Sequence, residues 1–183
     1  MNTKEMWNDH GTHAENDFSC WNPLPPNPEF VLLGSIPQNT YKKPWKGFVF
    51  HSADKEAFKD PIGYKFVSYL HIPKYFIELC VKIWNDKGTG ADSPSSIWRP
   101  ICSTGYKSVG VFCQDSRRRP LLSAMKCVHE IYVRACVSEW VWNDENSGSP
   151  KQVTVFKNDD PYLQGMEAIS TRSEMFGESY CLV

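Results

Sequence analysis

Residues 84–100 read WNDKGTGADSPSSIWRP, and recognisable versions of this stretch occur at two other places in the chain. Residues 7–23 read WNDHGTHAENDFSCWNP, and residues 142–158 read WNDENSGSPKQVTVFKN. Each copy opens with Trp-Asn-Asp and carries an aromatic residue fourteen positions later, giving the pairs Trp7/Trp21, Trp84/Trp98 and Trp142/Phe156. Three copies in one register indicate an internally repeated fold, so these positions are interpreted first as architecture.

The repeat continues beyond this block. An aromatic residue, a glycine and a proline recur at matching positions, as Phe30/Tyr106, Gly34/Gly110 and Pro44/Pro120. The first copy carries extra residues near 45–66, which we interpret as a surface loop. One domain, residues 1–183, then contains units at about 7–83, 84–141 and 142–183. The last unit is truncated, and either the fold tolerates this or the residues before Trp7 supply the missing strand.

Composition indicates the fold class. A chain of 183 residues suits one domain, and 14% aromatic residues with thirteen prolines and eleven glycines favour short strands joined by turns. We expect an all-β single domain with three internal repeats, for which a β-prism is the favoured architecture and a β-trefoil and a β-sandwich are alternatives. Residues 131–137 alternate as a strand does, so the matching segment near residues 67–83 is also predicted to be a strand despite its helical spacing.

Charge and cysteine usage limit the classes of partner and compartment. The formal net charge of −1 argues against nucleic acid as a partner. The N-terminus lacks an apolar signal region and no stretch is long enough to span a membrane, so we expect a soluble cytoplasmic protein, or one peripheral to membranes. Seven cysteines without a CxxC pair predict mostly reduced, buried thiols of a cytosolic protein.

The repeated Trp-Asn-Asp turn contains candidate ligand-binding carboxylates. Gly11, Gly88 and Asn146 occupy one aligned position, and these residue types accept a positive φ. The aligned aspartates could bond backbone amides two residues on or contact a ligand; they are Asp9, Asp86 and Asp144. Asp86 and Asp92 together offer hard oxygen ligands to calcium, although position 92 becomes Glu15 and Pro150 in the other copies.

Two basic clusters precede the shared prolines, and a tryptophan follows one of them. The clusters are either solvated turns or contacts for phosphate, sulfate or anionic lipid headgroups. Trp45 lies outside the repeated pattern and is the candidate exposed binding aromatic, whereas the repeated tryptophans are predicted to form a core around a central axis. The basic candidates are Lys42, Lys43, Arg117, Arg118 and Arg119.

Little in the chain indicates catalysis. It has no P-loop, GxGxxG, HExxH or GxSxG motif, and no reaction class follows from its residues. His71 and His129 are related by the repeat and are predicted to be structural histidines. We therefore expect no enzyme, no catalytic residue and no cofactor apart from the calcium considered above.

The runs WNDKGTGAD, IWRP, GYKSVG and MKCV, between Trp84 and Val128, resemble the vacuolar-protein-sorting-sixty-two-related family of β-rich domains. The repeats of that family are similar to those of the adaptor-binding region of large vacuolar-sorting lipid-transfer proteins. The flanking units depart from the pattern, because Asn22 stands where the second unit has Arg99 and the third unit lacks Trp-Arg-Pro. Similar β-prism-like domains accompany some membrane-attack-complex/perforin toxins, whose pore-forming portion this chain does not resemble.

These observations predict a non-catalytic recognition module. Its ligand would be a glycan or an anionic lipid headgroup at a membrane or cell surface, bound by loops at one end of the prism, and the resemblance implies a targeting role. The alternative is a protein-interaction adaptor in membrane trafficking, which the sorting association of the family suggests. Such an adaptor would bind an extended peptide along an exposed edge strand.

Overall fold

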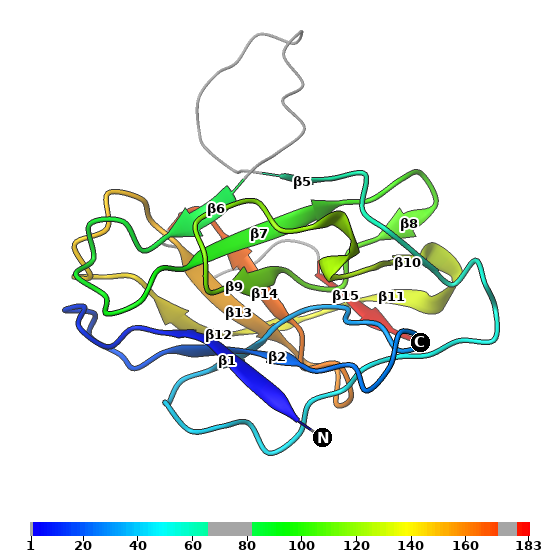
Figure 1. The fold of residues 1–183 in the computed structure, drawn as a ribbon, viewed down its shortest axis with the longest axis horizontal. Helices are drawn as coiled ribbons and strands as arrows, with labels where there is room; N and C mark the ends of the chain where they lie inside the picture. Colours follow the sequence, from blue (N-terminus) through cyan, green and yellow to red (C-terminus); the bar gives the residue numbers. More distant parts are fainter. Residues whose placement is uncertain (1, 66–81, 172–178) are drawn as a thin grey trace, which may run out of the picture.

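A computed structural model describes residues 2–65, 82–171 and 179–183 (Figure 1). Short strands make up most of its regular structure, together with two 3-10 turns, η1 (Leu122–Ala124) and η2 (Glu130–Tyr132). The strands are β1 (Thr3–Asn8), β2 (Ser19–Pro23), β3 (Ile36–Gln38), β4 (Phe58–Lys59), β5 (Gly63–Lys65), β6 (Lys82–Asn85), β7 (Ser96–Ile101), β8 (Tyr106–Lys107), β9 (Phe112–Gln114), β10 (Cys127–His129), β11 (Val133–Cys136), β12 (Ser138–Asn143), β13 (Thr154–Asn158), β14 (Met166–Ile169) and β15 (Ser179–Leu182).

Each repeat forms one antiparallel sheet. β1, β2 and β3 form the first sheet, β6, β7 and β9 the second, and β12, β13 and β14 the third. β5 also pairs with β7, and two smaller groups, β4-β10-β8 and β11-β15, lie beside the three sheets (Figure 1). The pairing of the first two strands shifts register at the equivalent place in every copy, just before Trp7, Trp84 and Trp142. The all-β, threefold-repeated domain predicted from the sequence is confirmed.

A ring of three backbone hydrogen bonds joins the sheets around a pseudo-threefold axis. Ser35 N donates to Val111 O at 3.0 Å, Val111 N to Met166 O at 2.7 Å, and Met166 N to Ser35 O at 2.8 Å. A glycine precedes each member, and a Cβ on Gly34 would lie 3.3 Å from the Cα of Gly110. The close approach of the three chains therefore requires glycine. Gly165 is thus the equivalent of Gly34 and Gly110 in the third unit.

The first tryptophan of each copy forms the central core, as predicted, whereas Trp98 lies in a separate cluster with Tyr64. Trp7, Trp84 and Trp142 are at most 3% exposed, and their ring centroids lie 5.1, 6.1 and 6.3 Å apart. Each indole N–H donates to the next unit: Trp7 to Ser93 O, Trp84 to Asp144 Oδ2 and Trp142 to Asn16 O, at 2.9–3.2 Å. Because every buried indole donor has a partner, these rings fill the core without an orphaned N–H.

The third unit is not completed by the N-terminus. Residues Thr3–Met6 belong to β1 and pair with β2 inside the first unit, whereas β15 at the chain end pairs with β11. Residues 133–136 form the predicted strand, but residues 130–132 form a 3-10 turn instead. The matching strand prediction for residues 67–81 lies outside the described residues.

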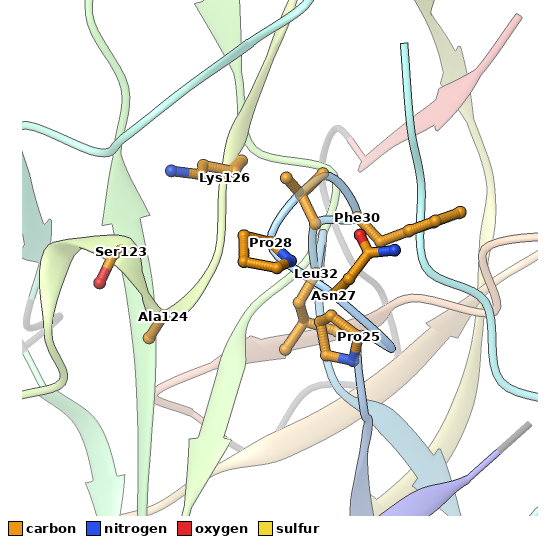
Figure 2. A pocket seen from close by; sticks show the side chains of 9 residues that line it. Pro25, Asn27, Pro28, Phe30, Leu32, Ser123, Ala124 and Lys126 are labelled. Atoms are coloured by element: carbon orange, nitrogen blue, oxygen red, sulfur yellow. The ribbon is translucent and has the colours of Figure 1, made fainter.

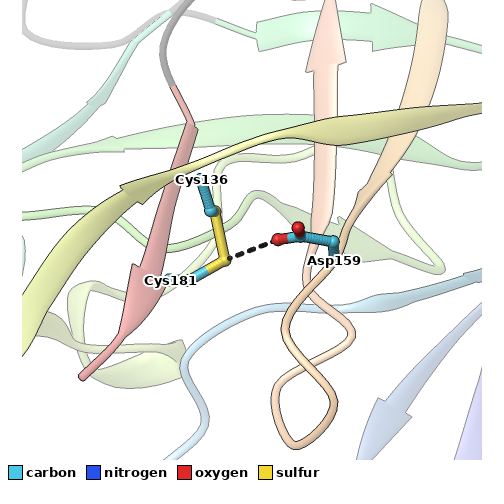
Figure 3. Close-up of side chains that lie close together, drawn as sticks. All are labelled: Cys136, Asp159 and Cys181. Atoms are coloured by element: carbon cyan, nitrogen blue, oxygen red, sulfur yellow. Dashed lines mark hydrogen bonds between the residues drawn. A yellow bond between two sulfur atoms is a disulfide. The ribbon is translucent and has the colours of Figure 1, made fainter.

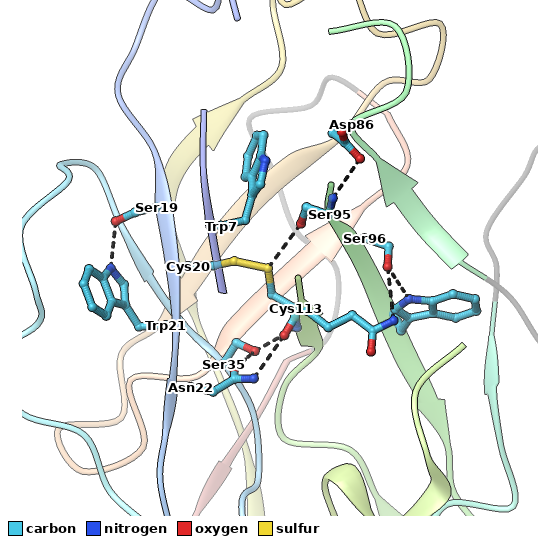
Figure 4. The surroundings of a disulfide bond; sticks show 12 residues. Trp7, Ser19, Cys20, Trp21, Asn22, Ser35, Asp86, Ser95, Ser96 and Cys113 are labelled. Atoms are coloured by element: carbon cyan, nitrogen blue, oxygen red, sulfur yellow. Dashed lines mark hydrogen bonds between the residues drawn. A yellow bond between two sulfur atoms is a disulfide. The ribbon is translucent and has the colours of Figure 1, made fainter. Parts of the chain in front are cut away.

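The prediction of mostly reduced cysteines is wrong, because the six cysteines among the described residues all form disulfides. Cys20 pairs with Cys113 (Figure 4), Cys102 with Cys127, and Cys136 with Cys181 (Figure 3). Spacing along the chain could not reveal these pairs, since strand pairing brings together cysteines up to 93 residues apart. Disulfides persist in oxidising compartments, so they remove the argument on which a cytosolic location rested. Within the described residues, no helix is both long enough and apolar enough to cross a membrane.

Candidate functional site

The three repeated aspartates are buried parts of the frame. Asp9, Asp86 and Asp144 are at most 4% exposed, and each Oδ1 accepts the backbone N–H nine residues on, at 2.8–3.1 Å. The predicted Asx turn is made instead by the preceding asparagine, whose side chain accepts the amide two residues on. Gly11, Gly88 and Asn146 have the expected positive φ, of 81°, 91° and 61°. Each buried aspartate therefore holds together the two ends of the loop that follows it.

Equivalent corner residues bond two of these carboxylates. Arg117 donates to Asp86 from two guanidinium nitrogens: Nε to Oδ1 at 2.9 Å and Nη2 to Oδ2 at 2.6 Å. Tyr41 occupies the same repeat position and bonds Asp9. Burial raises the pKa of the Asp9 carboxyl, although bonds from the Phe18 N–H and the Tyr41 hydroxyl act in the opposite direction. Arg117 and Tyr41, at equivalent positions of the repeat, therefore hold buried carboxylates of the repeated turns.

The calcium hypothesis for Asp86 and Asp92 remains a prediction. The structure leaves these carboxylates fewer unoccupied oxygens than the sequence indicated. Both Asp86 oxygens already accept hydrogen bonds, and the Asp92 carboxylate packs against Gly11 of the first unit. A search of the described residues for at least three clustered ligand groups gives Cys136, Asp159 and Cys181 (Figure 3). The two sulfurs of that cluster are joined in a disulfide, which leaves no thiolate to bind a metal.

The segment Tyr41–Gly47, which we call the Trp45 segment, displays the other predicted binding residues. Trp45 is 92% exposed, and Lys42, Lys43 and Lys46 are exposed around it. Pro44 and Gly47 are buried, and a Cβ on Gly47 would lie 2.8 Å from Thr3 Cγ2 and 3.3 Å from Pro23 Cγ. The backbone is therefore pressed onto the first sheet on both sides of Trp45. In the second unit, Arg118 and Arg119 are exposed beside Arg117.

Two of the three seams between sheets are closed by specific bonds. Between the first and second sheets, the Cys20–Cys113 disulfide is joined by Asn22, whose Nδ2 donates to Cys113 O at 3.1 Å, and by Ser35, whose hydroxyl donates to Asn22 Oδ1 (Figure 4). Between the second and third sheets, Arg99 takes the place of Asn22. Its Nη2 donates to Ala168 O at 2.7 Å, and its Nη1 lies 3.1 Å from Glu167 Oε2 as an ion pair.

The third seam, between the third and first sheets, is hollow. Lys157 occupies the position of Asn22 and Arg99 in the repeat. By that equivalence, its side chain would donate to the carbonyl oxygen of Pro37. That carbonyl instead accepts a bond from its neighbour Gln38, at 3.0 Å. A cavity of 170 Å³ lies here, lined by Gln38, Asn39, Glu139, Trp140 and Lys157 among others. A second cavity, of 220 Å³, shares Glu139 and Lys157 with it. We call this region the open seam.

A larger cleft, of 490 Å³, lies beside the proline-rich loop that follows β2 (Figure 2). Pro28, Phe30 and Leu32 form its apolar wall, and Ser123 lies across from them. Lys126 at its edge pairs with Asp60 at 2.5 Å, so its ammonium is already engaged. Sequence reasoning identified neither this cleft nor the open seam, because each joins segments far apart in the chain.

Three sheets closed around a pseudo-threefold axis define a β-prism-type domain. Residues 1–181 match the Vps62 family, described as vacuolar protein sorting-associated protein 62, and the chain therefore belongs to that family. The crystal structure of GNIP1Aa from Chromobacterium piscinae is similar, with a TM-score of 0.73 and 19% sequence identity, covering 96% of this chain and 33% of that one. This likeness concerns the fold alone, and the chain spans about a third of that protein's length. The search of curated proteins found no match.

Proposed function

We propose that the protein is a non-catalytic recognition module that binds anionic membrane surfaces through the Trp45 segment. The observation that supports this most strongly is a 92% exposed indole held between lysines on an anchored backbone. The indole places an apolar ring beside several positive charges, and this combination supports a binding surface at the segment.

The residue types of the segment match the chemistry of a membrane interface. Tryptophan prefers the headgroup level, where its ring is apolar and its N–H remains hydrated. Each lysine near an anionic leaflet contributes about 1 kcal/mol of attraction, which decreases with salt. Lys42, Lys43 and Lys46 together would therefore contribute about 3 kcal/mol, or roughly a hundredfold in affinity.

Anchoring of the backbone favours binding further. Because Pro44 and Gly47 are buried, little of the segment has to become ordered when Trp45 meets a surface. Tyr41 adds to this rigidity through its bond to the buried Asp9. The family description, which refers to vacuolar protein sorting, is compatible with work at a membrane surface.

Vesicle co-sedimentation tests the proposal, using phosphatidylcholine vesicles with and without phosphatidylserine. We expect binding to the anionic vesicles, a strong loss for the triple variant Lys42→Ala/Lys43→Ala/Lys46→Ala, and a loss for Trp45→Ala. Trp140→Ala is the matched control, because Trp140 is also exposed, at 42%, but lies in the open seam. Equal binding by all variants would remove the Trp45 segment from the mechanism.

Two further outcomes would redirect the assignment. The indole of Trp45 could instead stack on a sugar, so a glycan array that is positive for the native protein and negative for Trp45→Ala would identify a glycan as the ligand of this segment. Failure of the native protein in both assays would favour the alternative of a protein-interaction adaptor, which a pull-down with extended peptides would then examine.

A further inference from the structure

The geometry points to a second binding site, in the open seam, whose ligand is a small neutral saccharide of one or two rings. Its polar groups are presented by facing strands. Glu139 of β12 and Lys157 of β13 are direct cross-strand partners, and Asn39 follows β3 of the first sheet. The site is separate from the Trp45 segment and does not depend on the function proposed for it.

The polar side chains of this seam are available to a ligand. Within the described part of the chain, Asn39, Glu139 and Lys157 make no side-chain hydrogen bond and no ion pair of 4.0 Å or less. The positions equivalent to Lys157 in the other seams are engaged, since Asn22 and Arg99 each reach a carbonyl of the neighbouring sheet. The fold thus leaves at this seam donors and acceptors that it consumes at the other two.

The charges of the open seam disfavour a free anion. An anion drawn to Lys157 would meet the carboxylates of Glu139 and Asp159, and a cation drawn to these carboxylates would meet the ammonium of Lys157. A sugar hydroxyl both donates and accepts, so one ring can satisfy the ammonium, the carboxylate and the Asn39 amide together. The mixture of one cation with several carboxylates and amides therefore suits a polyol.

The size of the seam supports the same class of ligand. Its two adjoining cavities, of 170 and 220 Å³, are each smaller than the roughly 300–1,000 Å³ pockets that enclose drug-sized molecules. Trp140 also lines the first cavity, but it follows Glu139 in β12 and pairs with Phe156, so its indole lies on the other face of the sheet from Glu139 and Lys157. The polar groups therefore carry the recognition.

The test is a glycan array followed by isothermal titration with the methyl glycoside of the best hit. We expect Glu139→Gln and Lys157→Met each to weaken binding about tenfold or more, because a charged partner in a ligand hydrogen bond is lost. Asn39→Ala should also weaken binding, whereas Trp140→Ala should leave it near the native value, because Trp140 lies on the other face of the sheet. Trp45→Ala, the matched control at the membrane-binding candidate, should bind the glycoside as the native protein does.

Three results would overturn the proposal: no glycan bound by the native protein, unchanged affinity in all the seam variants, or equal loss in Trp45→Ala. Titration with phosphocholine distinguishes the other ligand that two opposite charges could hold, a zwitterionic headgroup, and preference for it over every glycoside would also overturn the saccharide. Urea midpoints of the variants, expected to stay near the native value, show that any loss concerns the seam and not the fold.

Discussion

The seam between the second and third sheets and the seam between the third and first occupy equivalent places and differ in how they are held. In the former, Arg99 reaches Ala168 O and pairs with Glu167, whose side chain is 1% exposed. In the latter, Lys157 has a glutamate opposite it, Glu139, but the pair lies in a hollow at the surface. At equivalent positions of the repeat, the cation of Arg99 closes one seam, whereas the cation of Lys157 lies in a surface hollow at the other.

The symmetry of the repeated backbone does not extend to the side chains that close the seams. The ring of backbone bonds and the tryptophan cluster already hold three equivalent sheets. A seam can therefore lose its closing bonds without loss of the fold, and the residues released are free to bind something else. The predictions below test this difference between closed and open seams.

The largest effect should follow from removing the disulfide of the closed first seam. Cys20→Ala/Cys113→Ala opens a loop of 93 residues, for which the chain-entropy argument gives a loss of up to about 4.7 kcal/mol in the free energy of unfolding. Urea denaturation measures it. A loss below about 1 kcal/mol would show that the seam is held by Asn22 and Ser35 instead.

Arg99→Met should be the next most damaging change. It leaves Glu167 buried without a cation, and removal of one partner of a buried pair destabilises by about 3–5 kcal/mol; we expect the lower end because the Arg99 side chain is 25% exposed. The double variant Arg99→Met/Glu167→Met should regain most of the loss in urea denaturation. If the double variant is as unstable as the single one, the ion pair is not the cause.

A pH dependence should distinguish the closed seam further. Burial raises the pKa of Glu167 above its ordinary value near 4.5, against the opposing effect of Arg99. Between that value and the raised one, the folded state binds more protons than the unfolded state, so stability falls as the pH rises through this window. In Glu167→Gln this fall should be smaller, measured as urea midpoints over a pH series. An unchanged slope would assign it to other groups, such as Asp9, whose pKa is also raised by burial.

The smallest effect should come from the open seam. Lys157→Met should change the free energy of unfolding by no more than about 0.5 kcal/mol, because Lys157 has no ion pair within the described residues. A thermal melt beside that of Arg99→Met makes the comparison direct. A loss similar to that of Arg99→Met would mean that the third seam is closed after all.

The sequence predicted the frame well because the frame is repeated. Fourteen-residue aromatic spacing indicated the core of Trp7, Trp84 and Trp142, and the aligned glycines indicated where the chain adopts a positive φ. Such positions are under the same local constraint three times, so three copies reveal it. The exposure of Trp45 was also predicted, since it falls outside the pattern.

What the sequence could not predict depends on contacts between units. Arg117 was predicted to lie in a solvated turn or to contact an anion, and its bond to Asp86, 31 residues away, was not foreseen because a buried carboxylate cannot be recognised from composition. The disulfides and the open seam likewise join residues whose separation along the chain carries no information about their proximity. Asp9, Asp86 and Asp144 were ambiguous for the same reason, because a buried aspartate and a ligand-binding one have the same neighbours in sequence.

The ring formed by Ser35, Val111 and Met166 has a consequence for how the domain can be divided. Each member donates to one neighbour and accepts from the other, so deletion of any one unit leaves both an amide and a carbonyl near the axis without partners. A fragment of two units cannot close the ring that three units close. The repeats are therefore not modules that can be added or removed singly: they are three parts of one cooperative unit, although each resembles a copy of the others.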